Sequence, residues 1–413
     1  MSVVRGRLLV FVAIAVSALV LRLAVTSFSP LAAEIRDDLG FSTTVTGVFG
    51  MLPTVMFAVF GLATPALGRR IGLEYTALVA MTAAALGLVG RALAPETASV
   101  LGFAALAFAG MGIGNVVVPP LVKRYFSHRL AVMSTVYIVG VQIGTIVPAF
   151  AAVPLAEAAG WRVSLGLWAV VAIVAALPWI PLALRASRTA VPVPQHAERT
   201  SGRAWRSPVG RSLMTMFAGT ALVSYTMFAW IPEVFADAGA SAAFGGAMVG
   251  LFSALGLVSA FAAPSVCVRL RNPFPVVAVC AALFVVAFAG LLFAPMAAPV
   301  LWIVLAGLGP STFPMSLTLI NLRARTHDGA AALSGFTQGV GYVVASTGPL
   351  LFGVLHDATG GWIAPFGFLT AAVALVVIGG WGACKPRMLE DSWGTGDADR
   401  ASHTESASTV STK

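Results

Sequence analysis

Charged residues are scarce in this chain. Asp, Glu, Lys and Arg make up 10% of its 413 residues, and 58% of the residues are hydrophobic. An ordinary water-soluble domain carries about 25% charged residues, so this composition excludes a globule surrounded by water. The net charge of +9 does not form a nucleic-acid patch, because the cations are scattered over seven short segments. We therefore expect no nucleic-acid partner.

The motifs of cofactor and metal chemistry are also missing. The sequence has no His-Glu-x-x-His, no Gly-x-Ser-x-Gly and no pair of acids placed for catalysis. None of its three lysines follows a glycine-rich phosphate loop, which excludes ATP-driven transport by this chain alone. The three cysteines lack the spacing of a ligand set or a disulfide framework. The sequence predicts no enzyme activity, no metal and no cofactor.

Long apolar runs fill most of the chain instead. Crossing a bilayer core takes about 20 apolar residues in a helix, and the first run is too long to be the apolar part of a signal peptide. The sequence therefore predicts an all-α integral membrane protein with twelve transmembrane helices. The runs are 8–32, 44–67, 75–94, 99–122, 131–155, 163–184, 211–235, 244–268, 274–294, 299–321, 330–355 and 363–384.

Cations and acids alternate between the gaps that separate these runs. Arginines and lysines gather at the N-terminus, in every second gap and after the last run, whereas the other gaps hold mainly Asp and Glu. Positive charge stays on the cytoplasmic side of a membrane. We therefore expect a multi-pass protein with both termini and the 185–211 loop in the cytoplasm.

The second half of the chain echoes the first at an offset near 200 residues. Pro30 corresponds to Pro232, Gly160-Trp161 corresponds to Gly361-Trp362, and six such markers keep the same order. This pattern is typical of transporters built from parallel repeats. The expected parts are an N-terminal six-helix bundle (1–185), a cytoplasmic linker (186–210), a C-terminal six-helix bundle (211–384) and a disordered cytoplasmic tail (385–413).

Arg22 is the most informative polar residue, because it lies near the middle of the first run. A charge at that depth costs several kcal/mol unless it has a partner or a water-filled cavity. No Asp or Glu lies mid-run anywhere in the sequence. A planar guanidinium can bind two oxygens or nitrogens at once, so Arg22 indicates a site for an anion or a strongly dipolar solute. Arg91 lies near the outer end of its run, where we expect its side chain to reach the membrane surface, with contact to the substrate as the alternative.

Uncharged polar residues recur in runs four, five, seven and eleven. Gln338 and Tyr342 are four residues apart and share one face of a helix. Taken together, these residues predict the lining of a central cavity, although each alone is also explained by a helix-to-helix hydrogen bond. The candidate substrate-binding residues are Arg22, Asn115, Tyr137, Gln142, Tyr225, Trp230, Gln338 and Tyr342.

Charged residues at the cytoplasmic ends of the runs predict a gate on that side. Glu74 is expected to pair with the neighbouring Arg69-Arg70. The candidate gate residues are Arg69, Arg70, Glu74, Lys123, Arg124, Arg323 and Arg325.

Three segments resemble the cyanate and 2-nitroimidazole transporter family of the major facilitator superfamily. They are Arg22-x-x-x-Thr26-Ser27-x-x-Pro30-Leu31, then Gly112-x-Gly114-Asn115-Val116-x-x-Pro119 with Lys123-Arg124-Tyr125-Phe126, and Leu333-Ser334-Gly335-x-x-Gln338-x-x-Gly341-Tyr342. The resemblance implies a twelve-helix facilitator with alternating access in a bacterial inner membrane, and small planar or anionic solutes. It also implies that Arg22, Asn115, Trp230, Gln338 and Tyr342 line the pathway.

We therefore expect a secondary active or facilitative transporter of a small anionic or dipolar organic solute, acting as a monomer in the lipid bilayer. The alternatives are a drug or metabolite exporter of the same fold, a membrane sensor and an integral-membrane enzyme. A proton symporter commonly uses an intramembrane carboxylate, and no run contains one near its middle. Symport with an anion bound at Arg22 and uniport both remain open.

Overall fold

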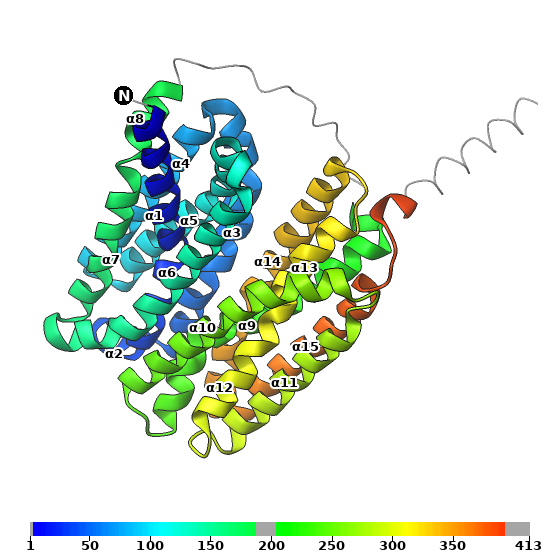
Figure 1. The fold of residues 1–413 in the computed structure, drawn as a ribbon. Coiled ribbons are helices and arrows are strands. Elements are labelled where there is room, and N and C mark those ends of the chain that lie inside the picture. The colour runs from blue at the N-terminus through cyan, green and yellow to red at the C-terminus, as the bar shows by residue number, and fades with distance from the viewer. Residues whose placement is uncertain (1–2, 187–203, 393–413) are drawn as a thin grey trace, which may run out of the picture.

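The computed structural model describes residues 3–186 and 204–392, and these segments are helical with short connections. Two bundles lie side by side, one drawn from blue to green and the other from green to red (Figure 1). Twelve helical segments within the described residues are long and apolar enough to cross a bilayer, which confirms the predicted number. With an even number of crossings, the described part of the chain begins and ends on the same side of the membrane.

The first bundle contains the N-terminal helices. They are α1 (Val3–Phe28), η1 (Ser29–Leu31), α2 (Ala32–Leu39), α3 (Thr43–Ile71), α4 (Leu73–Leu93), α5 (Thr97–Phe126), η2 (Ser127–Arg129), α6 (Leu130–Ala159), α7 (Trp161–Ala176) and α8 (Trp179–Ala186). The second bundle holds α9 (Pro208–Asp237), α10 (Ala242–Arg269), α11 (Phe274–Phe293), α12 (Pro299–Leu308), η4 (Gly309–Ser311), α13 (Thr312–Leu322), α14 (His327–Thr359), α15 (Ile363–Ala383) and η5 (Leu389–Ser392).

Proline explains why some crossings are made of two helices. Pro30, Pro178 and Pro310 lie where the first, sixth and tenth crossings change from one helix to the next. Proline lacks a backbone N–H and its ring crowds the preceding turn, so a regular helix is interrupted there. The first crossing extends to Leu39, seven residues beyond the predicted run, because α2 continues it after this break.

The contacts between the bundles repeat in the same way as the sequence. Helix α3 packs on α14, and α10 packs on α6. A Cβ atom at Gly47 would approach the carbonyl oxygen of Pro349 to 2.9 Å, and one at Gly246 would approach that of Ala149 to 2.8 Å. Both pairs depend on glycine to bring two backbones together, and they are related by the 200-residue offset. The two six-helix repeats therefore meet across a pseudo-twofold interface.

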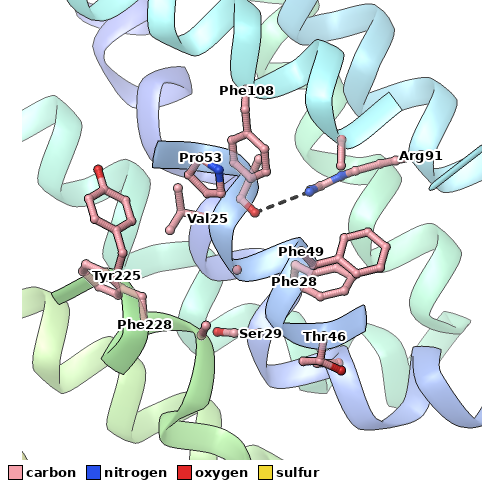
Figure 2. Close-up of a pocket in the computed structure, with 15 residues that line it drawn as sticks. Val25, Phe28, Ser29, Thr46, Phe49, Pro53, Arg91, Phe108, Tyr225 and Phe228 are labelled. Atoms are coloured by element: carbon pink, nitrogen blue, oxygen red, sulfur yellow. Dashed lines mark hydrogen bonds between the residues drawn. The ribbon is translucent and has the colours of Figure 1, made fainter. Parts of the chain in front are cut away.

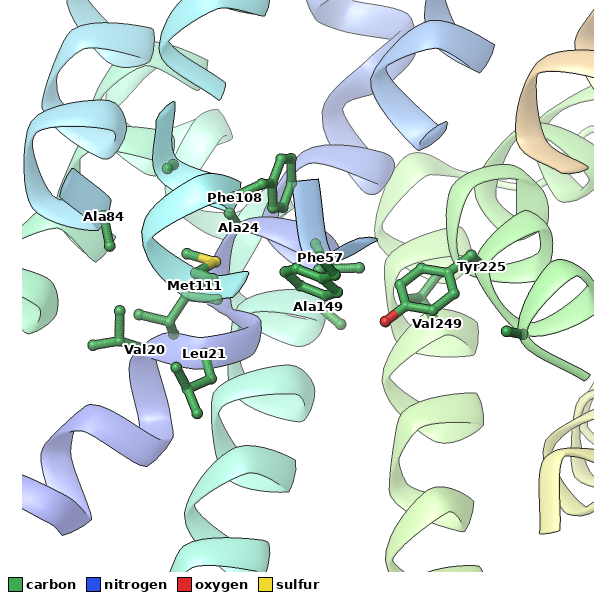
Figure 3. Packing of buried hydrophobic residues seen from close by; sticks show 14 of the residues in the cluster. Val20, Leu21, Ala24, Phe57, Ala84, Phe108, Met111, Ala149, Tyr225 and Val249 are labelled. Atoms are coloured by element: carbon green, nitrogen blue, oxygen red, sulfur yellow. The ribbon is translucent and has the colours of Figure 1, made fainter. Parts of the chain in front are cut away.

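Close packing fixes the position of α1 within its bundle. A Cβ atom at Gly144 of α6 would overlap the carbonyl oxygen of Leu19. The hydroxyl of Thr26 donates to the carbonyl of Thr145 at 2.6 Å, and Trp179 Nε1 donates to Ser17 Oγ at 2.9 Å. Buried apolar side chains surround the same stretch of α1 (Figure 3). The rotation of α1 about its axis, and hence the direction of Arg22, follows from these contacts.

The charged gaps place more acids at one end of the bundles and more cations at the other. We call the end that carries Asp38, Glu96 and Asp237 the acidic face, and the end that carries Arg70, Arg124 and Arg325 the basic face. On the acidic face Trp161 donates to Asp38 at 3.1 Å, and Trp362 donates to Asp237 at 3.2 Å. The same acid–indole bond therefore recurs in both repeats.

The start of the predicted tail has a described structure. Arg325 pairs with Asp391 at 2.6 Å. Glu390 accepts from the backbone N–H groups of Arg325 and Thr326 at 2.9 and 3.1 Å. Residues 385–392 thus pack against the start of α14, where we had expected disorder. Residues 393–413 and positions 187–203 of the predicted linker lie outside the described residues.

Candidate functional site

Arg22 lies among aromatic rings where the two bundles meet. Its guanidinium donates to the hydroxyl of Tyr225 on α9. The guanidinium carbon is 5.3 Å from the ring centre of Phe57 on α3 and 5.7 Å from that of Tyr225. The rings of Phe57, Tyr225 and Tyr342 are 6.1 to 6.4 Å apart, centre to centre. We call these four residues the Arg22 cage, and they come from α1, α3, α9 and α14.

The charge of Arg22 has no acidic partner among the described residues. The groups that interact with it electrostatically are the phenols of Tyr225, Tyr342 and Tyr137. Its side chain is partly exposed, whereas Phe57 and Tyr225 are buried. A guanidinium has five N–H donors, and the phenol of Tyr225 takes up only part of them. The cage therefore presents a cation with donors to spare.

This arrangement suits a small solute that accepts hydrogen bonds and has a flat shape. Arginine binds planar oxyanions in a two-pronged manner, and aromatic faces attract flat or cationic groups. The rings also limit the space around the guanidinium. The residues that the sequence predicted separately, Arg22, Tyr225 and Tyr342, are brought together here, with Tyr137 close by. Phe57 was missed, because a phenylalanine in an apolar run looks like any lipid-facing residue.

Several other predicted lining residues have partners away from the cage. Gln142 donates to the carbonyl of Ser253 in the opposite bundle at 3.1 Å, and Gln338 donates to Ser334 on its own helix at 2.7 Å. Trp230 is fully buried and donates to the carbonyl of Pro349 at 3.0 Å. The bonds of Gln142 and Trp230 join two helices, the bond of Gln338 stays within α14, and none of the three involves the guanidinium of Arg22. Asn115 is partly exposed on α5, with no side-chain hydrogen bond described for it.

Arg91 points into the protein, contrary to the expectation that it reaches the membrane surface. The residue is 1% exposed. Its guanidinium donates to Ser27 Oγ at 2.8 Å and to the carbonyl of Ala24 at 3.4 Å, both on α1. The expectation was wrong because position along a run says how deep a residue lies but not which way it faces. Arg91 lines a cavity that Tyr225 borders on the opposite side (Figure 2).

The predicted gate residues on the basic face pair within their own bundles. Glu74 is 1% exposed and lies 3.1 Å from Arg124 of α5, and it accepts from Tyr125 at 2.8 Å. The expected partners of Glu74, Arg69-Arg70, are exposed at the end of α3 instead. The rotation of α4 turns the carboxylate toward α5 and away from α3.

The remaining gate residues belong to the second bundle or to the surface. Arg323 donates to the carbonyls of Ala383 and Cys384 at 3.1 and 2.8 Å, which ties the end of α13 to the end of α15. Arg325 binds Asp391, and Lys123 is exposed.

Apart from the bond between Arg22 and Tyr225, the contacts of charged side chains that join the bundles in the described part of the chain lie on the acidic face. Arg36 of α2 forms an ion pair with Glu233 of α9 at 2.7 Å. Thr44 of α3 donates to Asp357 of α14, also at 2.7 Å. The bundles are therefore joined on the acidic face, and the cage lies on the inner side of that closure.

Comparison with known proteins gives the chain its family. The family model of the Major Facilitator Superfamily matches residues 14–346. The chain is 33% identical to an uncharacterized transporter, YycB, of Bacillus subtilis, over 90% of this chain and 92% of that one. It is 31% identical to the 2-nitroimidazole transporter of Escherichia coli, over 94% and 97%. It is 28% identical to the cyanate transport protein CynX of the same organism, over 87% and 92%.

Solved structures agree on the fold. A bacterial homolog of the human lysosomal transporter Spinster, in an inward-facing and unoccupied conformation, has a TM-score of 0.69 at 15% identity. That match covers 92% of this chain and 96% of the other. A D-xylose–proton symporter has a TM-score of 0.68 at 12% identity, with coverage of 92% and 98%. The fold and the sequence relatives lead to one conclusion: this chain belongs to the Major Facilitator Superfamily, among transporters of the 2-nitroimidazole and cyanate type.

Proposed function

We propose that the protein carries a small anionic or strongly dipolar organic solute across the membrane by alternating access, with Arg22 as the residue that binds it. The observation that carries this proposal is a mid-depth guanidinium that contacts both bundles and has no acidic partner among the described residues. Two relatives over most of the chain are named for 2-nitroimidazole and cyanate. Both solutes are small, flat or linear, and rich in hydrogen-bond acceptors.

The electrostatic gain at such a site is large enough to determine affinity. Two unit charges about 4 Å apart attract by about 4 kcal/mol at an effective dielectric constant of about 20. Desolvation of the solute removes part of this gain. A loss of the charge therefore weakens binding of an anion by about one to three orders of magnitude, since 1.4 kcal/mol corresponds to a factor of ten. A neutral but dipolar solute depends less on the charge and more on the N–H donors.

The closure on the acidic face supports the alternating-access part of the proposal. The ion pair between Arg36 and Glu233 joins the bundles there, so solute exchange from that side requires the pair to separate. We propose that the basic face is cytoplasmic, because positive charge stays inside. The described conformation is then closed to the outside. We also propose that the protein works as a monomer in the cell's inner membrane, with the predicted six-helix bundles as its moving parts.

The coupling proposal follows from which groups are near the site. No Asp or Glu interacts with Arg22 among the described residues, so we assign no proton-carrying carboxylate to the cage. We propose either uniport or co-transport of an anion bound at Arg22. Glu74 lies near the basic face and pairs with Arg124, which suits a structural contact rather than a proton carrier.

Uptake into proteoliposomes tests the proposal. Radiolabelled cyanate and 2-nitroimidazole are offered to the wild type, Arg22→Ala and Arg22→Lys, with and without a pH gradient. We expect uptake to be lost in Arg22→Ala and reduced less in Arg22→Lys, because lysine keeps the charge without the two-pronged donor. Arg269→Ala is the control, since Arg269 is an exposed arginine at the end of α10 that belongs to neither the predicted binding site nor the predicted gate. Wild-type uptake by Arg22→Ala would refute the assignment of the site.

A further inference from the structure

Three buried polar atoms without a protein hydrogen-bond partner belong to residues that line one cavity beside the Arg22 cage. They are Arg91 Nε, Ser29 Oγ and Thr46 Oγ1, and seven such atoms occur in the part of the chain that the structure describes. The three residues are 1%, 5% and 3% exposed. They come from α4, η1 and α3, which are far apart in the sequence. A buried polar group without a partner costs about 1–3 kcal/mol, so three around one cavity indicate a missing ligand.

The cavity combines these polar groups with apolar walls. Phe28 and Phe49 stack on each other with their ring centres 4.4 Å apart, and both line the cavity together with Phe108. Its volume is about 30 Å³, which is room for about two water molecules or one small anion. Figure 2 shows Arg91 on one side of the cavity and Tyr225 on the other. Tyr225 also belongs to the Arg22 cage, so the cavity and the cage share a wall.

The chemistry of the donors selects the sign of the ligand. Arg91 is a cation with no acidic partner among the described residues, and its Nε–H can only donate. The hydroxyls of Ser29 and Thr46 can donate as well. A cation or a group that can only donate hydrogen bonds cannot serve as the partner of these three donors. A small anion accepts from all three, and its charge offsets that of Arg91 in a region of low dielectric constant.

The cavity lies between the Arg22 cage and the acidic face. Arg91 is bonded to positions 24 and 27 of α1, two and five residues beyond Arg22. At 1.5 Å per residue these two positions lie roughly 3–8 Å further along α1 than position 22, in the direction of the acidic face.

We propose that this cavity, lined by Arg91, Ser29 and Thr46, is a second binding site, for a monovalent anion of about three or four heavy atoms. It lies between the acidic face and the Arg22 cage, where a solute that passes the Arg36–Glu233 closure meets it first. As a station on the transport path it rests on the proposed function. Anion binding itself is measured without transport, so the two proposals can fail separately.

Anion-dependent thermal unfolding of the purified protein tests the site. Nitrate and formate replace gluconate at constant ionic strength, and the rise in Tm with concentration yields an apparent Kd. The measurement is made in the Arg22→Ala background, so that the cage does not contribute. Within this background, Ser29→Ala/Thr46→Val removes the two unpartnered hydroxyls and leaves the charge of Arg91 in place. Arg91→Met removes that charge.

We expect the Ser29→Ala/Thr46→Val variant to weaken anion binding at least tenfold while its anion-free Tm is equal to or above that of its parent. That combination separates a ligand site from a structural role, because removal of a structural hydroxyl lowers Tm. Arg91→Met is expected to abolish the anion effect. Thr54→Val is the matched control, since Thr54 is a buried threonine of α3 that bonds to the carbonyl of Met51. It should keep the anion effect.

Three outcomes would overturn the proposal. The first is that neither nitrate nor formate raises Tm in the Arg22→Ala background, which would mean that the cavity holds only water. The second is an apparent Kd that stays the same in the hydroxyl variant. The third is an equal weakening by Thr54→Val. If the double variant does not fold, Ser29→Ala and Thr46→Val are measured singly, and each must weaken binding at least threefold. None of these outcomes depends on uptake, which tests Arg22 separately.

Discussion

Breaking the ion pair between Arg36 and Glu233 should shift the protein toward conformations open on the acidic face. Arg36 Nη1 and Glu233 Oε1 are 2.7 Å apart, and the two side chains are 21% and 13% exposed. At a dielectric constant between about 40 and 80, appropriate to this partial exposure, the attraction is about 1.5–3 kcal/mol. Holding two long side chains in place reduces the net contribution to about 1–2 kcal/mol. Glu233→Gln should therefore raise the ratio of open to closed molecules by about 5- to 30-fold.

Distances between spin labels on the acidic face measure this ratio. Labels at Ala98→Cys and Ala297→Cys lie on exposed positions of different bundles, and the three natural cysteines, all buried, are replaced by alanine. Separation of the bundles lengthens the distance between the labels. Exchange of the two charges, Arg36→Glu with Glu233→Arg, should restore the wild-type distribution.

The control for this experiment breaks an acid contact within one bundle. Asp38 pairs with Arg162 at 2.9 Å, and both residues belong to the first bundle. Asp38→Asn should therefore leave the distribution of distances unchanged. The reasoning is refuted if Glu233→Gln gives the same distribution as the wild type, or if the exchanged pair fails to restore it.

Three further changes test other contacts. Tyr225→Phe removes the hydroxyl that accepts from Arg22 but keeps the ring. A hydrogen bond to a charged group contributes about 1.5–3 kcal/mol. The apparent affinity for the solute, measured in uptake assays, should therefore fall at least tenfold. Arg124→Met leaves the buried carboxylate of Glu74 without its cation; because Arg124 is half exposed, we expect a loss of about 1–2 kcal/mol, read as a lower Tm in detergent. Glu390 is partly desolvated, which by itself raises its pKa, but backbone N–H donors at the start of α14 outweigh burial and lower the pKa. The stability it contributes is thus present at neutral pH and is lost as the pH falls through that lowered value. Glu390→Gln should accordingly flatten the decrease of Tm below about pH 4.5.

The sequence predicted best those features of the fold that the bilayer imposes. A hydrocarbon core requires a minimum length of apolar helix, so twelve runs became twelve crossings. The repeat was readable because matching prolines and glycines perform the same task in each half, as the Gly47–Pro349 and Gly246–Ala149 contacts illustrate. The end of the first crossing was predicted seven residues too early, since α2 has the composition of a surface segment.

The candidate site was predicted only in part, because a sequence gives the depth of a residue and not its direction. Depth alone singled out Arg22. It said nothing of Phe57, and it misdirected Arg91, whose guanidinium turns inward to α1 rather than outward to the surface. The partner of Glu74 was likewise decided by the rotation of α4.

The sequence by itself determined the solvent, the number of crossings and the distribution of charge between the two faces. Each of these depends on composition over many residues, and a bilayer enforces each of them with a large free-energy cost. Tertiary structure alone decided which polar groups meet. The packing of glycines and small side chains between helices sets the rotation of each helix about its axis. A turn of one residue position, about 100°, decides whether an arginine faces lipid, another helix or the cavity where a solute binds.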